Sequence, residues 1–585
     1  MSAAPFALTT THRLALDPGP DAEDSGRGLP NYLSSLTVSP DGSRVWIPSK
    51  KDNIQRGKFR DGLPLTFENT VRTIVSQIDM ATGREQLTAR IDFNDRDMAF
   101  ALEFSPLGDY AFVVLQGSNA VDVRDAYTGA LVAGVEETGL APQGLVMTAD
   151  GQRLLVHNFM SRTVAGYNIG GVTGSTTFAI VPLGTVDTVQ NERLVAHVLL
   201  GKQIFYNAAD PRMSKDGYLS CATCHLDGGH DGRVWDFTGR GEGLRNTVTL
   251  VGRAGLRHGR VHWTANFDEI QDFENDIRGA FGGDGFLTEA QWQSGTVANP
   301  LGQPKAGLSP ELDALAAYVA SLSAFGRSPH RLRSGGLTPE AERGHALFAR
   351  LGCAVCHSGP GFTDSPFGLT HDVGTIAAGS GQARGGPLTG FDTPTLRGLW
   401  ASAPYLHDGS AATLVDVLGR RNPLGRHGAT NSLTVAEKQD LAAYLLSIDD
   451  DDPGCFLAGT GEDLVLSSAV SGTPNGNCVE EAFARQSIHL RLDSPNGTFD
   501  GVIAGLVFQV YAPGSPPRPT FQGLHLDRID AAPSLVLLPP RGFTTVGTVP
   551  VGVGGAIARV QGFALSVTAQ NGAYATTAAH DVFLR

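Results

Sequence analysis

Two short stretches, Cys221-Ala222-Thr223-Cys224-His225 and Cys353-Ala354-Val355-Cys356-His357, share the pattern Cys-x-x-Cys-His. In this pattern each thiol can add to one vinyl group of a haem, and the histidine can ligate the iron. A zinc site would need two further ligands at metal spacing, and a thioredoxin-like redox pair would need a βαβ context. Neither accompanies the motifs. The sequence therefore predicts two covalently bound haem c groups, held by Cys221, Cys224, His225, Cys353, Cys356 and His357.

The surroundings of the two motifs also repeat. A helical segment precedes each motif, and the segments that close the two units read LAAYVASL at 315–322 and LAAYLLSI at 441–448. Their apolar residues recur at helical spacing. An internal repeat of this kind predicts two α-helical cytochrome c domains in tandem, at residues 196–335 and 336–450.

The first 195 residues have the pattern of short β-strands. The turns Ser39-Pro40-Asp41-Gly42, Ser105-Pro106-Leu107-Gly108 and Thr148-Ala149-Asp150-Gly151 each precede an apolar strand. Turns of this type between alternating strands are typical of propeller blades, so residues 1–195 are predicted to be β-propeller-like. Closed propellers have about four to eight blades, but only three are clear here, so the module either begins partway through a longer propeller or is small and open. An ordinary β-sandwich is the alternative.

Residues 451–585 differ from the helical part in composition. They are rich in Val, Gly, Thr and Pro, and alternating segments at 502–511, 534–538 and 558–567 predict a β-sandwich. Cys455 and Cys478, the two cysteines outside the motifs, could form a disulfide; two free thiols are the alternative. The expected fold class is therefore multidomain, with a β-propeller-like region, two cytochrome c domains and a C-terminal β-sandwich.

The composition excludes some classes of partner. The 585 residues carry a formal net charge of −14, which argues against a nucleic-acid partner because such a partner needs a basic face. No apolar run approaches the roughly 18 residues of a membrane span. Residues 1–20 lack the charged and apolar regions of a signal peptide. Because haem attachment normally occurs outside the cytoplasm, we expect a periplasmic or secreted protein whose leader is absent from this sequence.

The sixth ligand of each iron separates electron transfer from catalysis, and methionine is the common choice. The methionines are Met1, Met80, Met98, Met147, Met160 and Met213. None follows Met213, so the second haem, if six-coordinate, is expected to use a histidine or a tyrosine. The candidates are His371, His407, His427, Tyr405 and Tyr444.

Longer motifs carry a family resemblance. FDTPTLRG at 391–398, APYLHDGS at 403–410 and LRNT at 244–247 resemble the bacterial dihaem cytochrome c peroxidase/MauG superfamily over residues 196–450. The N-terminal turns are similar to YVTN-type blades. The resemblance implies a peroxide-binding haem at the first motif and a low-spin electron-transfer haem at the second.

The resemblance also implies where the distal ligand of the second haem lies. In well-known members it is Met or Tyr downstream of the His-Asp-Gly motif, but here that stretch, residues 422–428, contains His427. We therefore expect His427 to ligate the second iron; an exposed loop histidine is the alternative. Several peroxidases of the family place a distal histidine before the Arg-Asn motif, but residues 236–243 contain none. The first iron is therefore expected to be open to peroxide, with His230 nearest but shifted.

Residues 262–274 resemble the distal segment of the family. Cleavage of a peroxide O–O bond needs a group that moves a proton between the two oxygens, and the candidates are Glu269, Gln271 and Glu274, with Glu274 favoured. A solvated acidic helix face is the alternative. Trp263 matches the aromatic residue between the haems, although a buried core tryptophan would look the same.

Relatives bind calcium between the two domains through an asparagine side chain and backbone carbonyls. The matching positions are Asn246 and the segment from Asp392 to Pro394. Hard oxygen ligands suit calcium. A conventional hydrogen bond from Asn246 between the domains is the alternative.

The resulting hypothesis is an exported oxidoreductase that reduces hydrogen peroxide, or another small oxidant, at the first haem. Electrons would come from a donor protein, such as a small cytochrome or cupredoxin, through the second haem. Three alternatives stay open: MauG-like oxidation of a protein or small molecule, a non-enzymatic electron-transfer or partner-binding cytochrome, and an oxygenase acting on a polymer.

Overall fold

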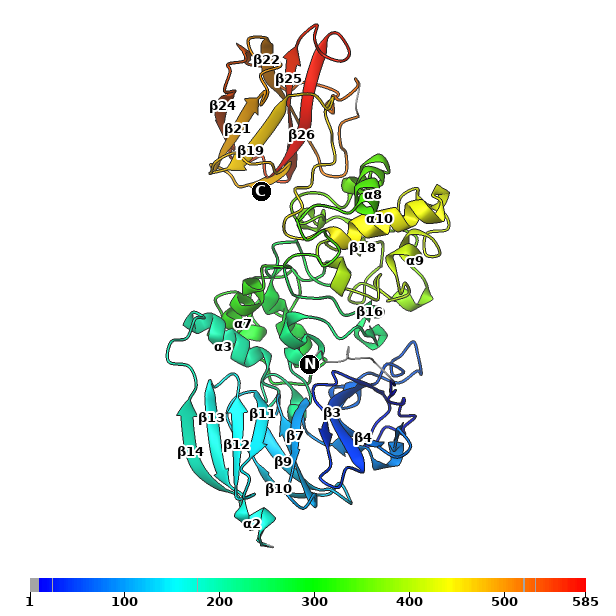
Figure 1. The fold of residues 1–585 in the computed structure, drawn as a ribbon, viewed down its shortest axis with the longest axis vertical. Coiled ribbons are helices and arrows are strands. Elements are labelled where there is room, and N and C mark those ends of the chain that lie inside the picture. Colours follow the sequence, from blue (N-terminus) through cyan, green and yellow to red (C-terminus); the bar gives the residue numbers. More distant parts are fainter. Residues whose placement is uncertain (1–9, 24, 176, 519–520, 532) are drawn as a thin grey trace, which may run out of the picture.

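A computed structural model describes residues 10–585, except residues 24, 176, 519–520 and 532. Met1 and the first residues of the expected N-terminal region lie outside the described residues. The molecule is elongated, with the N-terminal sheets at one end, the C-terminal sheets at the other, and the helices between them (Figure 1). In the described part of the chain, no helix has the length and apolar character needed to cross a bilayer.

The N-terminal β region contains three antiparallel sheets. The first has β1 (Leu29–Asn31), β2 (Thr37–Val38), β3 (Arg44–Asp52), β4 (Val71–Asp79), β5 (Arg84–Glu85) and β6 (Ile91–Phe93). The second has β7 (Ala99–Phe104), β8 (Tyr110–Leu115), β9 (Ala120–Asp125) and β10 (Leu131–Val135). The third has β11 (Pro142–Met147), β12 (Arg153–Asn158), β13 (Thr163–Asn168) and β14 (Val181–Asp187). Two short helices, α1 (Phe67–Thr70) and α2 (Gly170–Thr173), lie in the connections.

The three predicted turns join β2 to β3, β7 to β8 and β11 to β12. Gly42, Gly108 and Gly151 have φ of +70°, +73° and +67°, a conformation that favours glycine. Apolar residues fill the space between successive sheets, with Trp46 in the first cluster and Phe112 in the next. The sheets curl into a half-barrel, which confirms the β-propeller-like prediction (Figure 1). The alternative of a two-sheet sandwich is wrong for this region.

The first helical unit contains α3 (Ala196–Phe205), α4 (Cys221–Cys224), α5 (Glu274–Arg278), α6 (Glu289–Trp292) and α7 (Pro310–Ser321), with the short strands β15 (Val234–Asp236) and β16 (Leu244–Asn246). Ser309 caps α7, because its hydroxyl accepts a hydrogen bond from the Leu312 amide at 3.3 Å. Helices α3 and α7 pack so closely that a Cβ atom on Gly201 would clash with the carbonyl of Ala314.

The second unit repeats this arrangement. It contains α8 (Pro339–Arg350), α9 (Leu414–Leu418) and α10 (Val435–Ser447), with β17 (Thr370–His371) and β18 (Phe391–Asp392). Thr338 caps α8 and Thr434 caps α10. Gly344 lies where α8 crosses α10, against the carbonyl of Asp440. The two units therefore share one device, a helix pair that crosses at a glycine.

The C-terminal region has two sheets. One is ordered β19 (Val465–Val470), β21 (Ser487–Asp493), β24 (Phe543–Thr548). The other is ordered β20 (Val479–Ala482), β26 (Tyr574–Leu584), β25 (Ala556–Leu565), β22 (Ile503–Tyr511), β23 (Leu535–Leu537). Leu492 of one sheet and Ala504 and Ala564 of the other belong to one buried cluster. This packing agrees with the predicted sandwich.

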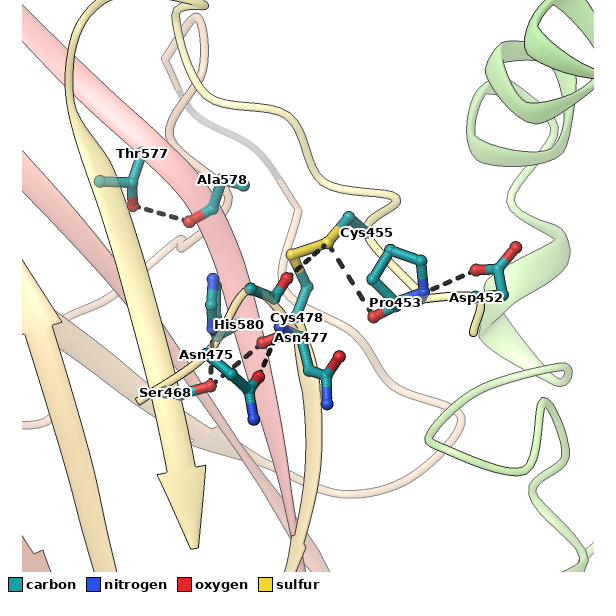
Figure 2. The surroundings of a disulfide bond; sticks show 12 residues. Asp452, Pro453, Cys455, Ser468, Asn475, Asn477, Cys478, Thr577, Ala578 and His580 are labelled. Carbon is teal, nitrogen blue, oxygen red and sulfur yellow. Dashed lines mark hydrogen bonds between the residues drawn. A yellow bond between two sulfur atoms is a disulfide. The ribbon is translucent and has the colours of Figure 1, made fainter. Parts of the chain in front are cut away.

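A disulfide bond lies at the start of this region. Cys455 and Cys478 are bonded, with their Cα atoms 5.0 Å apart, and the Cys478 amide donates to the Pro453 carbonyl at 3.1 Å. Figure 2 shows the bond beside the segment that leaves the second helical unit at Asp452. The predicted disulfide is confirmed, and the alternative of two free thiols is wrong.

Candidate haem sites

The first Cys-x-x-Cys-His motif forms a single helical turn, α4, followed by His225. The Ser220 amide donates to the Thr223 hydroxyl at 2.8 Å, which starts the turn. Both hydroxyls also donate to Asp97, a buried residue of the N-terminal β region, at 3.1 Å. Burial raises the pKa of the Asp97 carboxyl to about 7. The N-terminal region therefore supports the turn that carries both thiols.

The His225 ring is oriented for ligation. Its Nδ1 lies 3.0 Å from the carbonyl oxygen of Gly229. Because a carbonyl can only accept, Nδ1 carries the proton and Nε2 keeps a free lone pair. Burial lowers the pKa of His225, which favours the neutral, ligating form.

At the second motif, two histidine rings face each other. The ring centroids of His357 and His427 are 6.1 Å apart, with 35° between the ring planes. A metal–imidazole bond is about 2 Å long, so a metal ion between two imidazole rings places their centroids about 6 Å apart. Burial lowers the pKa of His427, and burial chiefly lowers that of His357 to about 3. Both rings are thus neutral donors at the separation that a shared iron requires.

A cavity of about 270 Å³ lies at this second site. Its walls include Cys353, Cys356, His357 and His427. Both thiols and both imidazoles therefore line one space, and this donor set fits a haem c with two histidine ligands.

The other four candidates for the sixth ligand have contacts of their own. His407 stacks on Phe391 with centroids 3.9 Å apart. The Tyr405 hydroxyl donates to the Leu399 carbonyl at 2.9 Å. The remaining two are His371, whose Nε2 lies 2.7 Å from Asp364 Oδ2, and Tyr444, which packs edge-on against the His345 ring. Of the five candidates, His427 is the one in ring contact with His357.

One group near the second motif resembles a metal site. Ligand atoms of Cys356, Asp364 and His371 all lie within 4.8 Å of one another. A metal ion there would need the Cys356 thiolate, which a thioether bond to haem would consume. The two uses of Cys356 are therefore mutually exclusive.

Trp263 lies between the two helical units. Its indole N–H donates to the Asn246 carbonyl at 2.8 Å, and its own carbonyl accepts from the Asp392 amide at 2.8 Å. Its ring centroid is 6.4 Å from that of His407, and it contributes to the wall of the 270 Å³ cavity. Trp263 is therefore tied to both units.

The residues expected at a calcium site are close to Trp263. The Asn246 side-chain amide donates to the Pro404 carbonyl at 2.5 Å, so the hydrogen bond between the units exists. Asn246 Oδ1 and Asp392 Oδ1 are buried and have no hydrogen-bond partner among the described residues. Burial raises the pKa of Asp392 to about 7. The backbone of Pro394 instead forms a hydrogen bond with the His357 ring, and this hydrogen bond opposes the fall in the pKa of His357.

Glu274, the favoured acid–base candidate, is fully buried. Its Oε1 accepts from Arg278 Nε at 2.8 Å and from the Leu287 amide at 3.0 Å, and its Oε2 accepts from the Phe286 amide at 2.9 Å. Both oxygens are thus committed to holding a loop. This geometry does not favour the acid–base role, and the alternative of a solvated acidic face is wrong for Glu274.

The other two candidates also have structural partners. Glu269 accepts from the Lys305 amide at 2.5 Å. Gln271 donates to Asp313 Oδ1 at 2.8 Å. Glu269 therefore connects the distal segment to the loop that precedes α7, and Gln271 connects it to α7 itself.

A neighbouring cluster was not predicted. His262 Nδ1 lies 2.8 Å from Asn266 Oδ1, and the amide of Asn266 donates to Glu242 at 2.6 Å. This pairing fixes the amide orientation, so His262 Nδ1 carries the proton and Nε2 is available. Nε2 lies 3.8 Å from Asp276 Oδ2. At this distance His262 and Asp276 can exchange a proton through one water molecule.

Two arginines accompany this pair. Arg384 lies 3.5 Å from Asp276 Oδ1. Burial lowers the pKa of Arg240, while the nearby Asp276 and Cys224 oppose that effect. The cluster thus lies within electrostatic range of the first Cys-x-x-Cys-His motif. The one signal in the sequence was the position of His262 next to Trp263.

Family models match parts of both helical units. Residues 195–324 match the family model described as di-haem cytochrome c peroxidase, and residues 390–424 match one described as RoxA-like, cytochrome c-like. The gamma subunit of hydrazine synthase from Kuenenia stuttgartiensis is 32% identical over 281 residues, which cover 41% of this chain and 74% of that protein. The methylamine utilization protein MauG of Methylorubrum extorquens is 29% identical over 299 residues, which cover 42% and 76%.

The cytochrome-c peroxidase IdrP1 of Denitromonas iodatirespirans is 28% identical over 338 residues, which cover 46% of this chain and 87% of that protein. Among solved structures, Kuenenia stuttgartiensis hydrazine synthase pressurised with xenon matches at 27% identity and a TM-score of 0.31, over 44% of this chain and 90% of the other.

Proposed function

Because the chain belongs to the di-haem cytochrome c peroxidase family, which is a family of oxidoreductases, we propose that it reduces hydrogen peroxide at the first motif with electrons relayed through the second. The cytochrome c-like units of the family imply haem c cofactors. The observation that carries the proposal is the difference between the two sites. His357 faces His427 at 6.1 Å, whereas among the described residues no ring contact involves His225.

This asymmetry supports different tasks for the two irons. An iron held by both His357 and His427 has no position left for peroxide, so it suits electron transfer. An iron held by His225 alone keeps one position free. Bound haem iron would supply the redox chemistry at that position.

Within this proposal, the protein supplies proton transfer at the first site. Reduction of one peroxide takes two electrons and two protons and yields two water molecules. The pair formed by His262 and Asp276 replaces Glu274 as the proposed acid–base group, because its Nε2 and carboxylate are not committed to holding a loop. Arg384 lies 3.5 Å from Asp276 Oδ1, and Arg240 also interacts electrostatically with Asp276.

The remaining parts of the proposal concern organisation. We propose a propeller-like domain at 1–195, cytochrome c domains at 196–335 and 336–450, and a sandwich at 451–585. We propose export to the periplasm or beyond the cell, in keeping with the disulfide between Cys455 and Cys478. The electron donor would be a small cytochrome or a cupredoxin.

A calcium ion between the helical units is also proposed. Support comes from two buried oxygens, Asn246 Oδ1 and Asp392 Oδ1, that have no hydrogen-bond partner in the described part of the chain. Oxygen atoms of this kind are the ligands that calcium prefers. Pro394 is included in the proposed site because it lies two positions after Asp392 in the chain, and no observed contact adds to that argument.

Steady-state turnover with peroxide and a reduced small cytochrome tests the proposed function. We expect turnover by the chain with two haems, and a fall of about 10²-fold or more in Asp276→Asn, the range of general acid–base catalysis. Asp268→Asn, an exposed carboxylate of the same segment, is the matched control and should keep full activity. Equal activity of both variants would refute the role of Asp276.

One observation favours a second candidate, MauG-like oxidation of another molecule. Trp263 is bonded to both helical units and borders the second cavity, so it could hold an oxidising equivalent between the irons. Negligible turnover together with a long-lived oxidised state would favour this candidate. Two six-coordinate low-spin irons would instead favour a non-enzymatic electron-transfer protein.

A further inference from the structure

A charged network is buried where the N-terminal sheet meets the first motif. Lys50 lies on β3 and its side chain is completely buried. Its ammonium lies 2.9 Å from Asp52 Oδ1 and 3.5 Å from Asp231 Oδ2. Asp52 Oδ2 in turn accepts from Arg233 Nε at 2.8 Å. Two cations and two anions thus balance in this network, and the side chains of Lys50, Asp52 and Asp231 are completely buried.

Aromatic residues connect this network to the first motif. The Tyr32 hydroxyl donates to the backbone carbonyl of Cys224 at 2.9 Å, and the Lys50 ammonium lies 4.6 Å from the centre of the Tyr32 ring. The indole N–H of Trp235 donates to Asp231 Oδ2 at 3.2 Å. The network is therefore next to the helical turn α4, which carries Cys224 and ends just before His225.

A second buried lysine provides an internal reference. Lys51 follows Lys50 on β3, and successive side chains of a strand point to opposite faces. Lys51 is also completely buried and pairs with two carboxylates, Asp17 at 2.8 Å and Asp92 at 2.9 Å. Asp17 and Asp92 belong to the N-terminal region itself. The two lysines are thus equally buried and equally paired, but they point to opposite faces of β3, and only Lys50 points toward the first motif.

From this arrangement we infer that Lys50 acts electrostatically on the first haem. Its buried positive charge raises the reduction potential of the iron bound by His225. A positive charge near the iron stabilises the ferrous form over the ferric form, and burial keeps that effect from being screened. The N-terminal region is then part of the redox site. The inference rests on the proposed attachment of haem at Cys221 and Cys224.

Spectroelectrochemical titration of the full chain with two bound haems tests the inference. Lys50→Met should lower the midpoint potential of the first haem, so that its ferric-to-ferrous ratio at a fixed potential rises on the order of tenfold. Asp52→Asn should shift the same potential upward, because it removes a negative charge. The double variant should return close to the parent value. Lys51→Met, the matched control, should leave the potential unchanged.

The outcomes separate a charge effect from a loss of structure. Equal shifts in Lys50→Met and Lys51→Met, or shifts of the same sign in Lys50→Met and Asp52→Asn, would overturn the inference. If neither lysine variant folds, Asp52→Asn still decides, since it conserves the shape of the side chain. A chain without covalent haem at Cys221 would refute the proposed function itself, whereas a fully loaded chain with unchanged potentials would refute only the role of Lys50.

Discussion

Gly344 marks the point where α8 crosses α10, and its replacement by alanine gives a sharp test of the second helical unit. A Cβ atom there would lie 2.7 Å from the carbonyl carbon of Asp440 and 2.8 Å from Tyr444 Cβ, and nearer still to the Asp440 carbonyl oxygen. The obstacle is helix backbone, which cannot rotate away. The helices must therefore separate.

The magnitude follows from this clash. Overpacking of a close-packed core costs about 1–3 kcal/mol, and a backbone obstacle favours the upper end of that range. A gap of about 1 Å forfeits a quarter to a half of the dispersion attraction across the contact. The higher helix propensity of alanine returns about 1 kcal/mol. We expect a net loss of about 2 kcal/mol in the free energy of unfolding of this unit.

Guanidinium unfolding followed in the Soret band measures this loss. Leu441 and Leu445 of α10 line the second cavity, so Gly344→Ala should also perturb the low-spin haem spectrum. Gly201→Ala is the matched variant, because it produces the same clash where α3 crosses α7. It should perturb the other haem. A Gly344→Ala chain with unchanged stability, or with a changed first haem only, would refute the packing argument.

Further predictions concern three other sites. Replacing His427 by alanine should remove the low-spin ferric signal of the second haem in electron spin resonance, and an unaltered spectrum would contradict its ligand role. Replacing Cys455 by serine removes the disulfide to Cys478, which joins residues 23 positions apart. Chemical unfolding should show a loss of about 3 kcal/mol in the stability of the sandwich. No loss would mean that the disulfide does not constrain the denatured state. Because burial raises the pKa of Asp97 to about 7, its contribution to stability is complete below about pH 4 and is lost as the pH rises through 7. The free energy of unfolding should fall by roughly 4 kcal/mol over this pH range. Asp97→Asn should remove this pH dependence, so parallel pH profiles of the two proteins would disprove the role of Asp97.

Local patterns were enough to predict several features. The turns ending at Gly42, Gly108 and Gly151 depend on residues only a few positions apart. The caps at Thr338 and Thr434 are equally local, because each hydroxyl accepts a hydrogen bond from the amide three positions on. The methionine census reduced the candidates for the second iron, and His427 lies opposite His357 in the fold.

Long-range partnerships could not be predicted. Asp97 meets Ser220 across 123 positions of the chain, and no periodicity in the sequence connects them. Glu274 was favoured because a carboxylate in that segment suited proton transfer, but two loop amides and Arg278 occupy it. Asp276, two positions after Glu274, stayed unnoticed because its role in proton transfer depends on the orientation of His262.

The support that Asp97 and Tyr32 give to α4 also constrains how the protein matures. Both residues precede Cys221 in the chain, so they are synthesised first. Thioether formation requires two thiols of one helical turn to approach two vinyl groups of the same porphyrin. Once Tyr32 holds the Cys224 carbonyl and Asp97 holds Ser220, that turn can no longer open to admit the ring. If haem is attached at Cys221 and Cys224 as proposed, we expect attachment to precede docking of the N-terminal sheet, because a delay would let the earlier-made sheet pack against an unfilled site.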